Sequence, residues 1–422
     1  MSKTDRRPAE TRPDGRTQIL NAAGEVFFRE GFARSSIDLI AATAHMSKQS
    51  IYEHFANKME LFEAAVRRTL DTRGGALAEV VAHDDVERTL CDYGTAMFQS
   101  FAHPRGFGLF RANIVAANHF PELADELHEH RLASAGILGD YFAELVASGR
   151  FPAVDPMATA IRFGGGAVEG TRYFLGAPIP DDAAIERLAA ESTHLFLHGY
   201  RELPANEGMA ELEDILASVE EPVLGANVAL RLSDDKLSRL IEAATDEFLE
   251  NAYTGTSVQK IAAQVRSSKA TVYRQFGNKE GLFRYLIERE IFLSSQADFT
   301  VPERTDAVQA VTDLARQVLD WHLTTANIRT HRLLIQEADF VPDLARKFYD
   351  VRAAVVARAL DRLLQAHGLP RPATHAARAF YVHATFAVRF LTVRQFPEPA
   401  QRDAYSREAA ILFLKGIGAT AA

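Results

Sequence analysis

The chain has little cysteine and no long apolar run, and each shortage excludes a class of protein. Cys91 is the one cysteine among 422 residues, so an intrachain disulfide is excluded and a reducing compartment is expected. No uninterrupted apolar stretch approaches the roughly 18 residues of a membrane-spanning helix. The opening residues, MSKTDRRPAETRPDGR, are polar and lack the apolar segment of a signal peptide. We therefore expect a cytoplasmic protein that does not contact a membrane.

The motifs of enzymes and metal proteins are missing as well. We find no glycine-rich phosphate loop after a strand, no H-E-x-x-H pattern and no nucleophile motif. His128 and His130 form an H-x-H pair, but two such side chains on a helix point to opposite faces. The sequence predicts no enzyme, no cofactor and no metal site. An enzyme built on a helical pocket is the least favoured hypothesis.

Charge argues against general binding of nucleic acid. The formal net charge is −9, so a polyanion would have to meet a locally basic face, because phosphate affinity comes from local lysine and arginine contacts. Hydrophobic residues make up 47% of the chain, as in a globular protein with a sizeable core.

One segment occurs twice. Residues 47–58 read SKQSIYEHFANK and residues 268–279 read SKATVYRQFGNK, with Ser, Lys, Tyr, Phe, Asn and Lys at identical spacing. The offset of 221 residues still aligns Arg131 with Arg352, and further on it falls to 217. A repeat of this length is far too long for a solenoid, so the sequence predicts one domain of about 200 residues present twice.

Both copies have the apolar spacing of amphipathic helices, as in Ile19, Ala22, Ala23, Val26 and Phe27. No segment alternates apolar and polar residues, so the predicted fold class is all-α. An acidic, proline-containing linker with one short helix near 209–219 separates the copies. The predicted divisions are a basic and polar arm at 1–15, a helix-turn-helix at 16–62, a helical body at 63–201, the linker at 202–236, a second helix-turn-helix at 237–283 and a second body at 284–422.

The repeated segment predicts three short helices, of which the third could enter a major groove. RTQILNAAGEVFFREGFARSSIDLIAATAHMSKQSIYEHFANKMELF (16–62) resembles the DNA-binding domain of the TetR family of transcriptional regulators. LSRLIEAATDEFLENAYTGTSVQKIAAQVRSSKATVYRQFGNKEGLF (237–283) resembles it too. The resemblance implies a regulator, most simply a repressor released by a small-molecule effector, whose partner is double-stranded operator DNA.

Two departures from the family pattern stand out. The family commonly has glycine in the turn between the second and third helices, where this chain has His45 and Arg266, which would strain the turn slightly or add charge near phosphate. Ala252 stands where the first copy has Gly31, so the first helix of the second copy is expected to end differently.

The expected DNA contacts follow from the same alignment. Lys58 and Lys279 would begin a fourth helix, where free N–H groups already favour a phosphate. Tyr52 and Tyr273 could give a hydroxyl to phosphate or pack on sugar and base. A core aromatic, a solvated lysine and a plain surface residue are the alternatives at these positions. The full predicted set is Ser36, Ser47, Lys48, Gln49, Ser50, Tyr52, His54 and Lys58 in the first copy, and Ser257, Ser268, Lys269, Thr271, Tyr273, Gln275 and Lys279 in the second.

By resemblance, each body would enclose an effector pocket, and its last two helices would form a four-helix interface. Those helices are expected at 155–176, 181–202, 373–395 and 399–417. The candidate pocket residues are Phe110, Asn113, Phe163, Arg172 and Tyr173 in the first copy and Trp321, Gln336, Tyr381 and Arg389 in the second. Aromatics at helical spacing are core more often than ligand contacts, so that alternative stays open.

The fused copies would make a pseudo-dimer within one chain, whose heads could diverge to read unlike half-sites. A homodimer with four heads is the other assembly that we consider. The competing function is a ligand-binding or protein-interaction module with vestigial heads, against which the intact lysines and tyrosines argue.

Overall fold

The computed structural model describes residues 14–32, 34–71, 76–152, 154–203, 209–222, 233–300, 306–386, 389–393 and 395–417. Within these ranges every regular element is a helix, so the all-α prediction is confirmed. None of the helices described is both long enough and apolar enough to cross a bilayer. The predicted arm before Asp14 lies outside the described residues, as do 204–208 and 223–232 of the predicted linker.

Each copy begins with a head of four helices. The helices of the first head are α1 (Gly15–Glu30), α2 (Ile37–Ala44), α3 (Lys48–His54) and α4 (Lys58–Asp71). Those of the second head are α11 (Asp234–Gly255), α12 (Val258–Gln264), α13 (Lys269–Phe276) and α14 (Lys279–Ser295). The first head is filled by buried apolar residues, among them Phe27, Ile37, Ile40, Ile51, Phe55 and Leu61.

Each head is followed by a helical body. The first body has η1 (Ala76–Glu79), α5 (Val86–Phe101), α6 (Pro104–His119), α7 (Pro121–Ala147), α8 (Pro156–Ala167), α9 (Asp182–His198) and η2 (Tyr200–Glu202). The second has α15 (Ala307–His322), α16 (Thr325–Glu337), α17 (Pro342–Ala366), α18 (Thr374–Ala384), η4 (Arg389–Leu391) and α19 (Pro399–Lys415). Five of these helices open on proline, which suits the first helical position because its missing N–H would be unpaired there anyway.

The short helix predicted in the linker is α10 (Met209–Ala217), and it packs on the second body. Met209 and Leu212 are buried in one cluster with Ala354 and Ala357 of α17. The ammonium of Lys347 donates to the carbonyl of Ser218 at 3.0 Å. This part of the linker is therefore docked on the second copy and does not hang free between the two.

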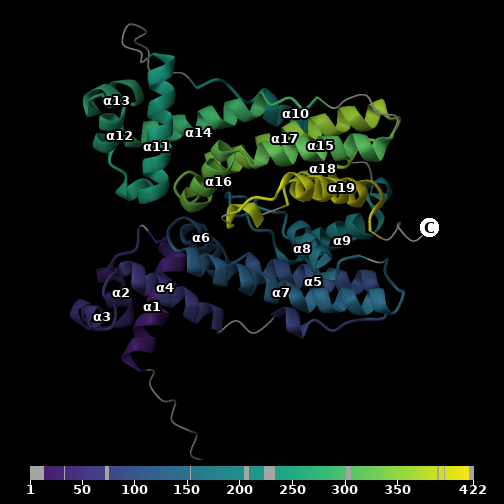
Figure 1. Ribbon diagram of the computed structural model, residues 1–422, viewed down its shortest axis with the longest axis horizontal. Coiled ribbons are helices and arrows are strands. Elements are labelled where there is room, and N and C mark those ends of the chain that lie inside the picture. Colours follow the sequence, from purple (N-terminus) through teal and green to yellow (C-terminus); the bar gives the residue numbers. More distant parts are fainter. Residues whose placement is uncertain are drawn as a thin grey trace, which may run out of the picture.

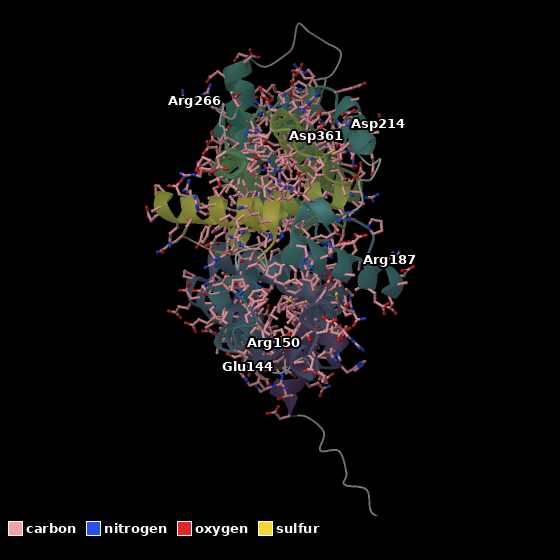
Figure 2. The ribbon with its side chains drawn as sticks, turned by 90° about the vertical axis from the view of Figure 1, so that its right-hand side faces the viewer. Glu144, Arg150, Arg187, Asp214, Arg266 and Asp361 are labelled. Carbon is pink, nitrogen blue, oxygen red and sulfur yellow. The ribbon has the colours of Figure 1, made fainter. Side chains whose placement is uncertain are left out.

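The copies lie one above the other, and α8 and α9 of the first copy face α18 and α19 of the second (Figure 1). Figure 2, turned by 90°, shows the yellow helices of the C-terminal part at the boundary with the first copy. At this junction the ring of Tyr200 stacks on Phe413 with centroids 4.5 Å apart, and Arg162 donates to Glu408 at 2.7 Å. Helices α8 and α18 are shorter than the predicted ranges, because the chain leaves each through a left-handed residue, Glu169 or Phe386.

A second contact between the copies lies close to the heads. Arg111 on α6 donates to both carboxylate oxygens of Asp339, at 2.7 and 2.9 Å. Its Nε donates to the carbonyl of Ile335 at the end of α16, at 3.0 Å. The two copies are thus joined at the central bundle and again beside the heads.

Candidate nucleic-acid interface and ligand site

The helix-turn-helix of each head is fixed by serine caps. Ser47 Oγ accepts the backbone N–H of Ser50 at 3.0 Å, and Ser268 Oγ accepts that of Thr271 at 3.0 Å. In the same way, Ser36 and Ser257 cap α2 and α12. The four serines of the predicted DNA-contact set therefore have a helix-starting role in the structure, since each satisfies an N–H group that the first helical turn leaves unpaired.

The turns that lack the family's glycine adopt the glycine conformation nevertheless. His45 has φ 51° and Arg266 has φ 49°, both in the left-handed region. Both side chains are exposed, so neither fills the core. The expected strain is present, at a cost of roughly 1 kcal/mol per residue.

On the recognition helix of the first head, most of the residues predicted to contact DNA are exposed to solvent. Lys48, Gln49, Tyr52 and His54 are exposed, with 48% of Tyr52 accessible. Ser50 is half-buried. Tyr52 is therefore not a core aromatic, and its hydroxyl and ring are available to a duplex.

The second recognition helix differs. Lys269 is exposed, Thr271 and Tyr273 are half-buried, and the ammonium of Lys269 lies 5.1 Å from the Tyr273 ring centroid. Gln275 is only 7% exposed, so its side chain does not face solvent in this conformation and its predicted base contact stays a prediction. α13 continues through Phe276, one residue beyond the point equivalent to the end of α3, and Gln275 lies on its inner side.

Lys279 also departs from its expected role. Its ammonium donates to the carbonyls of Tyr253, Thr254 and Thr256 at 2.7, 3.3 and 3.3 Å. It lies 4.7 Å from the Tyr253 ring centroid, and burial lowers its pKa. An ammonium has three donors, so all of them are engaged and none is left for a phosphate in this conformation.

Lys58 is placed in the same way in the first head. Its ammonium lies 4.6 Å from the ring centroid of Phe32, the residue equivalent to Tyr253. The side chain is half-buried, and burial lowers the pKa of the ammonium. In both heads this lysine holds the end of the first helix against the start of the fourth.

The charge on the two recognition helices is unequal. Arg274 is exposed on α13 where α3 has exposed Glu53. Lys48 is paired with Asp38 at 3.1 Å, whereas Lys269 makes no ion pair within the described residues. Arg274 is absent from the predicted contact set, although the change from glutamate to arginine at this position could have pointed to it. α3 and α13 lie at the same end of the molecule (Figure 1).

The predicted pocket residues of the first body are packed against other protein groups. Phe110 stacks on Phe174 at 4.0 Å, Phe163 meets Phe196 edge-on at 5.1 Å, and Asn113 donates to the carbonyl of Leu109 at 3.1 Å. Both Arg172 and Tyr173 donate to the carboxylate of Glu169. These five residues do not surround one pocket.

In the second body, Trp321 and Tyr381 meet at the fully buried Arg352. The guanidinium carbon lies 3.6 Å from the Trp321 ring centroid, and its Nε donates to the Tyr381 hydroxyl at 3.2 Å. Its Nη1 donates to Asn327 at 2.8 Å, and its Nη2 has no hydrogen-bond partner among the described residues.

Buried histidines adjoin this arginine. Burial, reinforced by the charge of Arg352, lowers the pKa of His322 to about 3 and that of His331 well below its usual range. The two rings lie 5.0 Å apart. Both are therefore neutral at physiological pH, which avoids three adjacent buried charges.

Gln336 and Arg389, the remaining pocket candidates, line two separate cavities. Gln336 borders a cavity of about 50 Å³ between the heads, together with Arg34 and Glu337. Arg389 borders a cavity of about 560 Å³ between α7 and the segment before α19. The nine candidates thus fall into three groups. Five pack against other groups of the first body, two contact the buried Arg352, and two border separate cavities.

Glu87, His194 and His198 bring one possible metal-ligand atom each to within 4.8 Å of one another. His194 and His198 are four residues apart and share a helix face, a spacing that the H-x-H argument does not cover. His194 Nδ1 lies 3.3 Å from the Glu87 carboxylate and His198 Nε2 lies 3.6 Å from it. Contacts between carboxylate and imidazole account for this group without an ion.

In a comparison with known protein families, the head and the body of each copy both match a family model. The family model described as bacterial regulatory proteins, tetR family, matches residues 19–65 and 240–286. The model described as AefR-like transcriptional repressor, C-terminal domain, matches residues 88–202 and 309–416. Heads and bodies are thus each matched twice.

Individual relatives correspond to about one copy. The chain is 35% identical over 172 residues to the DNA-binding transcriptional repressor TetR of Mycobacteroides abscessus, a match covering 40% of this chain and 87% of that protein. It is 26% identical over 203 residues to the HTH-type transcriptional activator FasR of Mycolicibacterium smegmatis, covering 44% and 90%. A transcriptional regulator from Rhodococcus sp. Rha1 is similar in structure, with a TM-score of 0.36, 19% identity and coverage of 43% and 94%. The family models match well over half of the chain, which therefore belongs to the TetR family and is a DNA-binding transcriptional regulator that carries the family's unit twice.

Proposed function

We propose that a single chain binds operator DNA as a pseudo-dimer and represses transcription until a small ligand releases it. The observation that carries this proposal is the placement of α3 and α13 at one end of a chain whose copies are joined by Arg111 and Asp339 beside the heads (Figure 1). Two recognition helices presented on one side suit adjacent major-groove segments of a single duplex. The match of both bodies to an AefR-like repressor domain supports repression.

The heads would read unlike half-sites. Residues at equivalent recognition positions differ in kind, with Gln49 opposite Ala270 and Glu53 opposite Arg274, all of them exposed. A glutamine can make a bidentate contact with adenine, which an alanine cannot, whereas alanine packs on the thymine methyl. The operator should therefore be asymmetric, with its stronger electrostatic grip under the second head.

Release would follow from a change in head spacing. A ligand that favours a separation of the heads other than the groove spacing shifts the population away from the DNA-bound form. The Arg111–Asp339 pair lies where such a shift would act, because it joins α6 to the end of α16 next to both heads.

The test is a gel shift with one head altered at a time. Replacing Lys48 and Tyr52 by Ala should weaken binding, as should replacing Lys269 and Tyr273, and the combined variant should not bind. Tyr52 is exposed, so its loss should leave the fold intact, which thermal unfolding would verify. Specific binding that persists in the combined variant would refute the assignment of the heads.

A further inference from the structure

The two bodies contain a matched segment that has diverged at one position. Glu169 after α8 and Phe386 after α18 lie 217 residues apart, and both are left-handed, with φ 49° and 57°. An arginine follows each of them by three residues, Arg172 in the first copy and Arg389 in the second. The shared backbone shows that these are equivalent positions, so the two arginines provide an internal comparison.

In the first copy, the chain supplies the arginine with its own carboxylate. Arg172 donates to both oxygens of Glu169 at 3.0 Å, and the Tyr173 hydroxyl donates to the same group. The cavity that adjoins Glu169 and Tyr349 has a volume of only about 20 Å³. This site is neutralised and filled.

In the second copy, the carboxylate is missing. Arg389 lies 5.4 Å from the ring centroid of Phe386, which stands where the glutamate would be. Arg131 reaches the same place from α7, donating to the hydroxyl of Thr392 and to His128 at 3.2 Å. Among the residues that the structure describes, no ion pair joins either arginine to an acid, although Asp125 lies on the cavity wall.

These cations destabilise one another. Burial, followed by the charge of Arg389, lowers the pKa of Arg131 to about 10. Burial and both arginines lower the pKa of His128. A carboxylate bound between the arginines would relieve this repulsion and complete two charge-assisted hydrogen bonds.

The space beside Arg389 is large enough for an organic molecule. Arg389 and His128 border the cavity of about 560 Å³, a size within the usual range for small-molecule sites, about 300–1,000 Å³. Its wall combines this cationic side with an apolar one. The apolar side is made by Ala124, Phe390, Val393, Phe396, Pro397 and Tyr405.

We propose that this cavity binds an organic carboxylate with an aromatic body, one molecule per chain. The carboxylate would meet Arg389 and Arg131 as the side chain of Glu169 meets Arg172 in the other copy, and the ring would lie on the aromatic wall. The site joins α7 of the first copy to η4 of the second, so its occupation would act on their relative position. Only that regulatory consequence rests on the proposed repressor function; binding itself does not.

The test uses 2-naphthoate as the probe and 2-naphthamide as its uncharged counterpart, with the full chain and no DNA. Naphthoate fluorescence should titrate to saturation at one site, and the amide should bind at least about tenfold more weakly, as expected for loss of a charge-assisted contact. Arg389→Gln should weaken naphthoate binding by a similar factor. Arg187→Gln, which removes a remote exposed arginine visible in Figure 2, should leave it unchanged.

A second pair of variants tests the internal comparison directly. Phe386→Glu restores the carboxylate of the first copy and should abolish naphthoate binding. Phe386→Gln introduces an uncharged side chain of the same size as glutamate and should retain more of the binding. Absence of saturable binding to the wild-type chain, equal affinity for amide and carboxylate, or full affinity in Arg389→Gln would each overturn the proposal. Because DNA is absent, failure of the repressor function would leave these results unchanged.

Discussion

Gly199 and Gly416 occupy equivalent positions 217 residues apart, and their backbones meet where the last helices of the two copies end. Their φ values are 78° and 65°. A Cβ on Gly199 would lie 2.8 Å from the backbone nitrogen of Gly416, and Ile417 donates to the carbonyl of Phe196 at 2.8 Å. No side chain fits at this crossing, so it joins the copies through their main chains.

Gly416→Ala should therefore loosen the junction. The added methyl group would meet the backbone of Leu197 and would also disfavour the left-handed φ, for a predicted loss of about 2–3 kcal/mol in unfolding free energy. Gly368→Ala is the matched control, because Gly368 has φ 66° and no atom near its absent Cβ. Chemical denaturation of both variants isolates the contact, and equal losses would contradict it.

Ala252→Gly should stabilise the second head. Ala252 has φ 50° and ψ −179°, close to the backbone of its counterpart Gly31, with φ 79° and ψ 159°. This conformation is costly for any residue with a Cβ, so relief should raise the unfolding free energy by about 1 kcal/mol. The reciprocal Gly31→Ala should lower it. Thermal unfolding measures both, and a lower melting temperature for Ala252→Gly would contradict the strain.

Buried neutral histidines should make the second body sensitive to acid. The folded pKa of His322, about 3, lies below the value of about 6.5 for an unfolded chain, so its contribution is present above pH 6.5 and is lost as pH falls toward 3. His322→Phe installs the residue of the first copy, Phe101. The slope of stability against pH should flatten by up to about 1.4 kcal/mol per pH unit.

The control for this prediction is His54→Phe, which removes an exposed histidine from the first head. Stability measured by denaturation from pH 7 to pH 4 should keep the wild-type slope in that variant. An unchanged slope in His322→Phe would show that His322 is not buried in its neutral form.

Lys279→Met should lower the stability of the fold and should not remove a contact with a DNA phosphate. The loss of three hydrogen bonds to the carbonyls of Tyr253, Thr254 and Thr256, at the end of α11, should lower stability by about 1–3 kcal/mol. In the folded variant, the slope of the logarithm of DNA affinity against the logarithm of salt concentration should be unchanged. Lys269→Met should instead reduce the slope by about 0.9, as expected for one lost phosphate contact. A reduced slope in Lys279→Met would show that Lys279 contacts a phosphate and would contradict this prediction.

The sequence predicted the helices of the heads because apolar spacing is a local signal. Ile51 and Val272, for example, are fully buried as their spacing requires. The burial of Gln275 could not be predicted, because the equivalent residue of the first head, His54, is exposed and the local spacing is the same in both heads.

The candidate ligand site was harder to predict, since its residues come together only when the copies pack. Arg131 and Arg389 are 258 residues apart, and no spacing rule links them. The replacement of Glu169 by Phe386 is readable in the sequence, but only once the offset of 217 is applied.

Selection of bound duplexes from random DNA, with the number of chains per duplex measured by analytical ultracentrifugation, tests the central claim most directly. We predict one chain on a site with two unlike half-sites, about 10 base pairs apart or a multiple of that spacing. A perfect palindrome bound by two chains, or no enriched sequence at all, would contradict the pseudo-dimer.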